Sequence, residues 1–195
     1  MGLEGKLQNH IKRFDKLLSI EKTTLLIIDI QERILPVIHQ SNIVVENTIK
    51  LIKGFNVLGL PIYYTEQYPK GLGKTVSSIK DELENREAFQ KLSFSCSGAA
   101  DLFNELERKN LSQVVVCGIE SHVCVQQTVL DLLANKFQVN LAADAISSRK
   151  IKDYEIALSR MEKSGAEVTT AEAILFELLN VCGTDKFKQI SRIVK

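Results

Sequence analysis

The sequence predicts an α/β protein, a three-layer α/β/α sandwich built around a mostly parallel sheet of about six strands. Two runs of apolar and largely β-branched residues, at 24–29 and 113–117, have the composition of strands that are covered on both faces. Segments with apolar residues at helical spacing separate the strands, and this alternation is typical of parallel βαβ units. With 195 residues, 45% of them hydrophobic, the chain fits one domain over 1–195.

The first half of the chain predicts two helices and three strands. Apolar side chains at helical spacing predict a helix over 3–18, within an N-terminal helical extension of residues 1–20. Gly59 and Pro61 mark the turn from the second helix into the second strand, and a glycine-containing loop then follows. In chain order the predicted elements after the first helix cover 24–29 (strand), 45–55 (helix), 62–65 (strand), 66–75 (loop) and 88–91 (extended).

The second half continues the alternation of helices and strands. Asp144 is expected in the turn after the fifth strand, and residues 169–172 form a capping box that begins a helix through Leu179. The predicted elements cover 98–108 (helix), 113–117 (strand), 122–135 (helix), 137–141 (strand), 151–163 (helix), 166–168 (strand), the capped helix, and 185–194 (helix).

Charge and composition exclude several classes of partner. Lys plus Arg (25) nearly balance Asp plus Glu (24), and no basic block indicates nucleic acid or a membrane surface. No apolar run reaches the ~18 residues of a membrane span and no secretory signal opens the chain, so we expect a cytoplasmic protein. No Gly-x-Gly-x-x-Gly or Walker sequence follows a strand, so the sequence implies no nucleotide cofactor.

The four cysteines show no zinc-ribbon or Cys-x-x-Cys spacing, and reduced thiols are expected. Packing accounts for Cys117 within a strand and for Cys182 after a helix. Cys96 is open to two interpretations, an oxidation-sensitive thiol or merely a small residue.

Cys124 follows the buried strand 113–117 and falls near the predicted first turn of a helix. Unpaired N–H groups and the positive end of the helix dipole favour a thiolate there, which predicts a lowered pKa and a nucleophile. The alternative interpretation is a buried structural cysteine.

Two other segments carry candidate catalytic side chains. Asp29 ends the strand 24–29, and the carboxyl ends of parallel strands are where α/β sheets bind ligands. It is a candidate acid or base, with a turn or cap residue as the alternative. Lys91 lies among apolar and small residues in the segment 89–96, where a lysine is otherwise usually a solvated surface charge.

The segments Leu-Ile-Ile-Asp-Ile-Gln, Phe-Gln-Lys-Leu-Ser-Phe-Ser and Gly-Ile-Glu-Ser-His-Val-Cys-Val, in this order, resemble the isochorismatase-like cysteine hydrolases, which include nicotinamidases and N-carbamoylsarcosine amidases. The resemblance extends from about 24 to 179, and the sequence 65–73 is similar to a branch whose members lack an assigned substrate. It implies that Cys124 attacks a carbonyl carbon, that Asp29 moves the proton and that Lys91 supplies positive charge.

The resemblance also implies an oxyanion hole formed by the backbone N–H groups of Glu120 and Cys124, with a cis peptide bond between Ile119 and Glu120. The role of the Glu120 side chain is left open. His122 precedes Cys124 by two positions, a spacing that does not support a Cys-His dyad on a helix.

Three further residues are candidates for substrate binding. Gln31 leaves the strand on the same face as Asp29, so it either contacts substrate or holds a loop. Tyr68 and Phe94 are expected to shape a pocket wall. The chain reads Glu66-Gln67-Tyr68 where zinc-binding nicotinamidases carry Asp-x-His, so no metal site is expected.

The sequence therefore predicts a metal-independent cysteine hydrolase, without a cofactor, that cleaves a small amide or a related carbonyl compound. The alternative is a non-catalytic binding or scaffold protein of the same fold with a redox-sensitive Cys124. The predicted partners are a small-molecule substrate and further copies of the chain in a homo-oligomer, because an apolar stripe over 3–18 needs to be covered.

Overall fold

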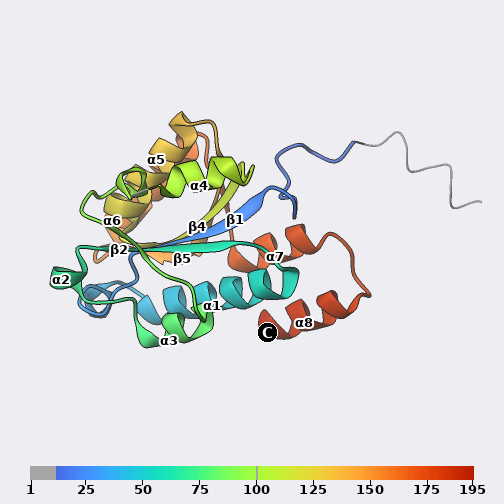
Figure 1. Ribbon diagram of the computed structural model, residues 1–195, viewed down its shortest axis with the longest axis horizontal. Helices are drawn as coiled ribbons and strands as arrows, with labels where there is room; N and C mark the ends of the chain where they lie inside the picture. The colour runs from blue at the N-terminus through green and yellow to red at the C-terminus, as the bar shows by residue number, and fades with distance from the viewer. Residues whose placement is uncertain (1–11, 100) are drawn as a thin grey trace, which may run out of the picture.

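A single sheet of six parallel strands forms the centre of the protein (Figure 1). The computed structural model describes residues 12–99 and 101–195. The strands lie in the order β3-β2-β1-β4-β5-β6, and every pair is parallel. The strands are β1 (Thr23–Ile28), β2 (Ile62–Gln67), β3 (Phe89–Lys91), β4 (Gln113–Ile119), β5 (Gln138–Ser147) and β6 (Glu167–Thr169).

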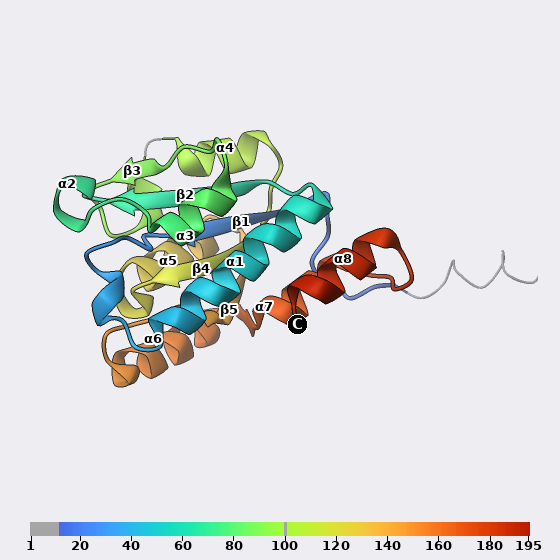
Figure 2. The same cartoon turned by 90° about the horizontal axis from the view of Figure 1, so that it is seen from below.

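Helices cover both faces of the sheet, which confirms the predicted three-layer sandwich (Figures 1 and 2). Helices α1, α3, α7 and α8 lie on one face, and α4, α5 and α6 lie on the other. The helices are α1 (Ser41–Leu58), α2 (Pro69–Leu72), α3 (Ser77–Lys80), α4 (Leu102–Arg108), α5 (Gln126–Ala134), α6 (Ile151–Lys163), α7 (Ala171–Leu179) and α8 (Asp185–Ile193). A π-helical turn, η4 (Ser121–Val125), joins β4 to α5.

Alternation along β1 divides the core in two. Leu25 and Ile27 pack into the cluster on the α1 side, whereas Leu26 and Ile28 pack into the cluster on the α5 side. All four side chains are at most 1% exposed. Burial on both faces explains why this strand reads as a continuous apolar run in the sequence.

The strand order places the carboxyl ends of β1 and β4 side by side at the centre of the sheet. Chain connections leave the sheet in opposite directions on the two sides of this pair, and such a point opens a crevice in α/β folds. Gly118 in β4 has a φ of +124°, and a Cβ built on it would lie 2.1 Å from the carbonyl oxygen of Ile28. Only glycine allows β4 to approach β1 so closely there.

The predicted helix over 3–18 is not formed in its described part. Residues 3–11 lie outside the described residues, and residues 12–18 form turns and irregular chain. Phe14 is 65% exposed and Leu18 is 1% exposed, so the two do not share one buried stripe. Tertiary contacts oppose the helix, since the Leu18 N–H donates to the Glu177 carboxylate and Arg13 donates to the Glu177 carbonyl oxygen.

Several predicted boundaries also differ from the structure. Strand β5 continues to Ser147, so Asp144 lies within a strand and not in a turn. The strand is longer because a register shift between Val116 and Gly118 lets β4 pair with β5 a second time. A 3-10 turn over Cys96–Gly98 precedes α4, which delays the start of that helix. Helix α7 is capped by Thr170, whose side chain accepts from the Ala173 N–H at 3.4 Å.

Candidate active site

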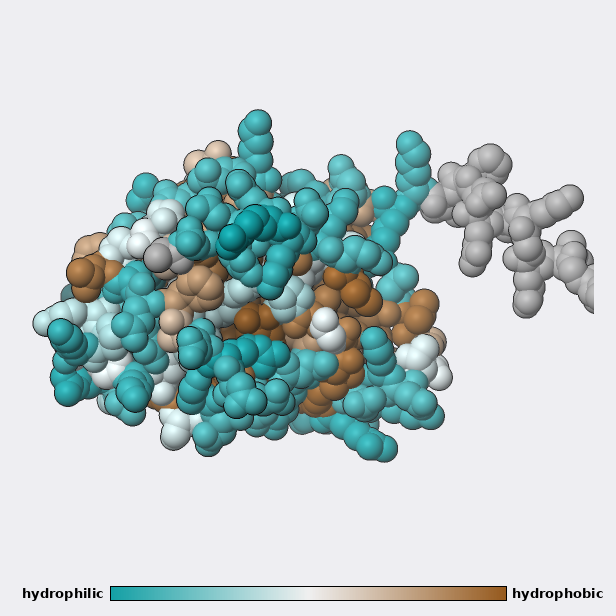
Figure 3. Space-filling model, viewed as in Figure 1, coloured by the Kyte–Doolittle hydropathy of each residue, from teal (hydrophilic) through white to brown (hydrophobic). Residues whose placement is uncertain are grey.

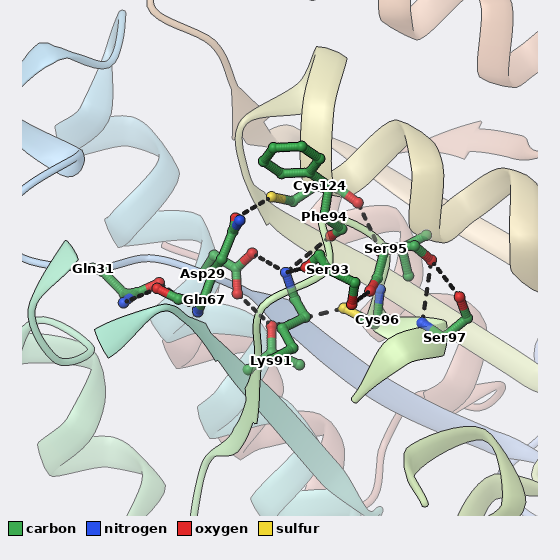
Figure 4. A network of polar contacts seen from close by, with 12 residues as sticks. Asp29, Gln31, Gln67, Lys91, Ser93, Phe94, Ser95, Cys96, Ser97 and Cys124 are labelled. Carbon is green, nitrogen blue, oxygen red and sulfur yellow. Dashed lines mark hydrogen bonds and ion pairs between the residues drawn. The ribbon is translucent and has the colours of Figure 1, made fainter. Parts of the chain in front are cut away.

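Four strand ends contribute polar side chains to one site at the carboxyl edge of the sheet (Figure 4). Asp29 follows β1, Gln67 ends β2, Lys91 ends β3, and Cys124 lies in η4 after β4. Asp29 has a φ of 53°, in the left-handed region that non-glycine residues seldom adopt. Residues from four separate parts of the chain thus meet where the strand order predicts a crevice.

Asp29 and Lys91 form a buried ion pair. Lys91 Nζ lies 2.6 Å from Asp29 Oδ2, and the side chain of Lys91 is 0% exposed and that of Asp29 is 3% exposed. The Thr65 hydroxyl donates to the other oxygen, Asp29 Oδ1, at 2.7 Å. Burial lowers the pKa of Lys91, but the charge of Asp29 and its hydrogen bond with Lys91 raise it, and the pKa lies above its ordinary value of 10.5. Lys91 is therefore a fixed positive charge beside the carboxylate.

Two backbone carbonyl groups complete the surroundings of Lys91. Its Nζ donates to the carbonyl oxygen of Phe94 at 2.9 Å and to that of Ser93 at 3.2 Å. The segment that follows β3 thus folds back over its own lysine and holds the ammonium group in place (Figure 4).

Cys124 is a buried thiol that faces two acceptors. It is 5% exposed, and its Sγ donates to Gln67 Oε1 at 3.0 Å. Burial and the negative charge of Asp29 raise the pKa of the Cys124 thiol, and the positive charge of Lys91 lowers it by less. The prediction of a lowered pKa is wrong for the structure without substrate. Burial of the thiol and the charge of Asp29 raise the pKa by more than the start of the helix lowers it.

Glu120 connects the end of β4 to the turn that carries Cys124. The peptide bond between Ile119 and Glu120 is cis, as the resemblance implies. The Glu120 carbonyl oxygen accepts from the N–H groups of Val123 and Val125 at 3.1 and 3.2 Å, which closes η4. Its carboxylate accepts from Arg149, through the backbone N–H at 3.1 Å and through Nε at 3.0 Å.

Asp29, Gln67, Glu120 and Cys124 border a cavity of about 300 Å³. Tyr68 and Phe94, both predicted to shape a pocket wall, line the cavity and are each 52% exposed. The described residues that line it are Asp29, Ile34, Gln67, Tyr68, Leu72, Phe94, Ile119, Glu120, Val123 and Cys124. This set contains two carboxylates and no Lys or Arg side chain, and most of its members are apolar.

Gln31 does not line the cavity, so the structure favours the loop-holding interpretation over substrate contact. It is 0% exposed, and its side-chain amide donates to the carbonyl oxygens of Gln67 at 3.0 Å and Gly73 at 2.7 Å. Its Oε1 accepts from the Gln67 N–H at 2.8 Å. Both ends of the amide are used in fixing the backbone of the loop after β2.

Sequence reasoning missed Gln67 and Thr65, which contact Cys124 and Asp29. The signal was available, because both residues lie at the carboxyl end of a strand, the position that selected Asp29. The predicted strand over 62–65 ended two residues too early, which left Gln67 in a loop.

The remaining cysteines and His122 lie outside the cavity lining. Burial and the charge of Asp29 raise the pKa of Cys96 to about 11, and burial raises the pKa of Cys117 to about 12. Cys182 is exposed, so the prediction that packing accounts for it is wrong. His122 Nδ1 lies 2.9 Å from Ser148 Oγ, so His122 forms its hydrogen bond with Ser148 and not with Cys124.

The residues present at the site do not match a metal centre. Over 12–99 and 101–195, no group of three or more His, Cys, Asp or Glu side chains has the arrangement to hold a metal ion. The Glu66 carboxylate is used within its own loop, where it accepts from the N–H and the hydroxyl of Thr75 at 2.8 and 3.0 Å. None of the helices in the described part of the chain is long and apolar enough to cross a membrane.

Comparison with known proteins identifies the family. Residues 23–173 match the isochorismatase domain. Isochorismatase domain-containing protein 1 from Salmo salar is 41% identical over 167 residues, which cover 86% of this chain but 59% of the salmon protein. The chain thus spans about three fifths of the length of that relative.

Solved structures agree with this assignment. A structure described as MAR1 ribonuclease from Caenorhabditis elegans superimposes with a TM-score of 0.84 and 35% identity, covering 91% of both chains. YcaC from Escherichia coli, described as an octameric hydrolase of unknown specificity, shares the fold with a TM-score of 0.85 and 19% identity, covering 94% of this chain and 91% of that chain. The chain belongs to the isochorismatase domain family.

Proposed function

We propose that the protein is a metal-independent cysteine hydrolase that cleaves small amides or related carbonyl compounds. The observation that carries this proposal is that Cys124 and Asp29 line one cavity, that Lys91 is paired with Asp29, and that the Cys124 thiol donates to Gln67. A nucleophile, a proton acceptor and a fixed positive charge are what acyl transfer to sulfur requires.

The reaction proceeds in two halves. Cys124 Sγ attacks the carbonyl carbon while its proton passes to Asp29, and the backbone N–H groups of Glu120 and Cys124 stabilise the oxyanion. The tetrahedral intermediate expels the amine, which takes the proton from Asp29, and leaves a thioester on Cys124. Asp29 then removes a proton from water, hydroxide adds to the thioester, and the acid departs as the thiol regains its proton.

Lys91 acts on the proton balance between Asp29 and Cys124. The carboxylate and a thiolate repel one another in a buried site, and at an effective dielectric constant near 20 two unit charges ~4 Å apart interact by about 4 kcal/mol. The ammonium group of Lys91, 2.6 Å from Asp29, offsets this repulsion.

The cavity determines the size and polarity of the substrate. A volume of about 300 Å³ accommodates a compact molecule, and the walls formed by Tyr68, Leu72 and Phe94 offer apolar contact to its carbon skeleton. The absence of Lys and Arg from the described lining disfavours a polyphosphate such as RNA, although the structural relative from C. elegans is described as a ribonuclease.

A screen of small amides for release of ammonia or amine tests the proposal. Wild-type protein should hydrolyse at least one amide, and Cys124→Ala should lose about 10³-fold or more of that activity, because no other group replaces the thioester route. Cys182→Ala removes an exposed cysteine that does not line the cavity, and it serves as the matched control.

A parallel incubation with single-stranded RNA separates the other possibilities. Cleavage of RNA that is lost in Cys124→Ala, without amide hydrolysis, would replace the amide by RNA as the substrate. A folded protein that is inactive in both assays would support the scaffold alternative, in which Cys124 responds to oxidants. The cytoplasmic location stays a prediction.

A further inference from the structure

We propose that Glu120 selects the substrate, and that the cavity prefers small amides that carry a cationic nitrogen, such as an ammonium or guanidinium group. This inference rests on the proposed function and names the substrate class of the same site. It starts from an acidic side chain in the cavity lining that the chemistry of Cys124 does not use. Glu120 is 9% exposed and lines the cavity.

The two oxygens of the Glu120 carboxylate differ in their partners. Both contacts from Arg149, the backbone N–H and Nε, go to Oε1. Within 12–99 and 101–195, Oε2 accepts no hydrogen bond from the protein. It is also not fully buried, because the fully buried side-chain atoms without a hydrogen-bond partner are Thr48 Oγ1, Tyr63 Oη and Ser121 Oγ. Oε2 is therefore an accessible, unpaired oxygen on a residue that lines the cavity, and a carboxylate oxygen in such a place needs a donor.

An anchoring role does not require the charge of Glu120. The contacts with Arg149 tie the turn before α6 to the end of β4, and a glutamine carbonyl oxygen would accept the same two hydrogen bonds. The Arg149 side chain is 56% exposed, so water screens its charge and it offsets only part of the charge of Glu120. Part of the negative charge of Glu120 therefore remains unbalanced at the wall of the cavity.

Asp29 and Gln67, two other polar residues of the lining, are already engaged. Asp29 is paired with Lys91 and accepts from Thr65, and Gln67 Oε1 accepts from the Cys124 thiol. A substrate bound with its carbonyl carbon at Cys124 can therefore place a cationic group at Glu120 while its carbon skeleton contacts Phe94. An anionic substrate meets repulsion at the same position.

Alkylation of Cys124 by charged reagents tests this preference without a known substrate. The probes are (2-bromoethyl)trimethylammonium, iodoacetamide and iodoacetate, which are cationic, neutral and anionic. In each reaction the S–C bond forms as the halide leaves with the bonding electrons, and the thiol proton passes to Asp29 and then to solvent. Peptide mass mapping gives the rate at Cys124, and exposed Cys182 in the same molecule corrects for the intrinsic reactivity of each reagent.

Two substitutions are expected to change the corrected ratio of cationic to anionic rates in opposite directions. Glu120→Gln keeps the acceptor for Arg149 and removes the charge, so the ratio should fall about tenfold. Arg149→Met leaves the carboxylate without its counter-charge, so the ratio should rise. Asp153→Asn removes an acidic group from a half-exposed position near His122, outside the cavity lining, and should change the ratio by less than about twofold.

An unchanged ratio in folded Glu120→Gln, or a fall in Arg149→Met, overturns the inference. Because Arg149 is exposed, its variant keeps the test decisive even if Glu120→Gln does not fold. Alkylation needs no turnover, so failure of the amide screen does not affect this result. Conversely, hydrolysis of amides together with an unchanged ratio would retain the proposed function and remove Glu120 as its selector.

Discussion

At the residue scale, the central feature is a thiol that rests in its protonated form. Cys124 donates to Gln67 and lies beside the negative charge of Asp29, and both burial and that charge raise its pKa. In the proposed mechanism the thiolate is therefore formed at the moment of attack, when the proton moves to Asp29. This differs from a cysteine that is ionised before substrate binds, and we expect the ion pair of Asp29 and Lys91 to control the reactivity of Cys124.

Substitutions on the two sides of this ion pair should change the reactivity of Cys124 in opposite directions. Lys91→Met removes the charge that lowers the pKa of the Cys124 thiol, so that pKa should rise. At a fixed pH below the pKa, alkylation should slow about tenfold for each unit by which the pKa rises. Asp29→Asn removes the charge that raises the thiol pKa, so the rate should reach its plateau at lower pH. The rate of labelling by iodoacetamide across neutral and alkaline pH measures both. A change in the same direction for both variants would contradict the assigned charges.

At the scale of elements, helix α5 fixes the segment that holds Lys91. Asp131 on α5 accepts from the hydroxyl groups of Ser95 and Ser97, and Thr128 Oγ1 accepts from the Cys96 N–H at 3.0 Å. The same segment presents the carbonyl oxygens that accept from Lys91 Nζ. The helix that follows Cys124 thus also positions Lys91, through a loop that is distant from the helix in the sequence.

Asp131→Ala should loosen this segment and weaken the site. Loss of two hydrogen bonds to a partly exposed carboxylate is expected to cost about 1 kcal/mol of unfolding free energy, and hydrolysis by Cys124 should slow because Lys91 is held less firmly. Denaturant unfolding and the amide assay measure the two effects. Asp153→Ala, on α6, is the matched control for removal of a surface carboxylate. Equal effects from both variants would remove Asp131 from its positioning role.

At the scale of the whole molecule, exposed apolar side chains raise the question of assembly. On the face shown in Figure 3, hydrophobic surface gathers around α7 and α8, where Phe176 is 36% exposed and Val181 is 56% exposed. Phe14, which carries part of the predicted stripe, is 65% exposed. Association with another copy of the chain would cover such surface, so the homo-oligomer stays our prediction.

Light scattering at micromolar concentration should give a mass that is a multiple of 21.9 kDa. Val181→Asp is expected to lower that mass, because a charge at an apolar interface opposes association. Ile156→Asp, at an equally exposed apolar position on α6, is the control and should leave the mass unchanged. A mass of one chain for the wild type would show that the protein is a monomer.

The sequence alone determined the alternation of strands and helices, because side chains buried on one or both faces impose a period that can be read locally. It also led to Asp29, Lys91 and Cys124, since strand ends and the resemblance to a family both select them. Tertiary structure decided what depends on distant partners. Contacts with Glu177 oppose the helix over 12–18, and pairing with β4 extends β5 through Asp144.

The protonation of Cys124 was likewise decided by the tertiary structure. Its position at a helix start is visible in the sequence and favours a thiolate, but the burial of the thiol and its approach to Asp29 are set by the packing of four separate strands. The same holds for Glu120, whose charge is evident in the sequence. Arg149, which follows β5 in the chain, binds one of the Glu120 carboxylate oxygens and leaves the other unpaired. Electrostatic effects of this kind act through space, so local sequence does not contain them.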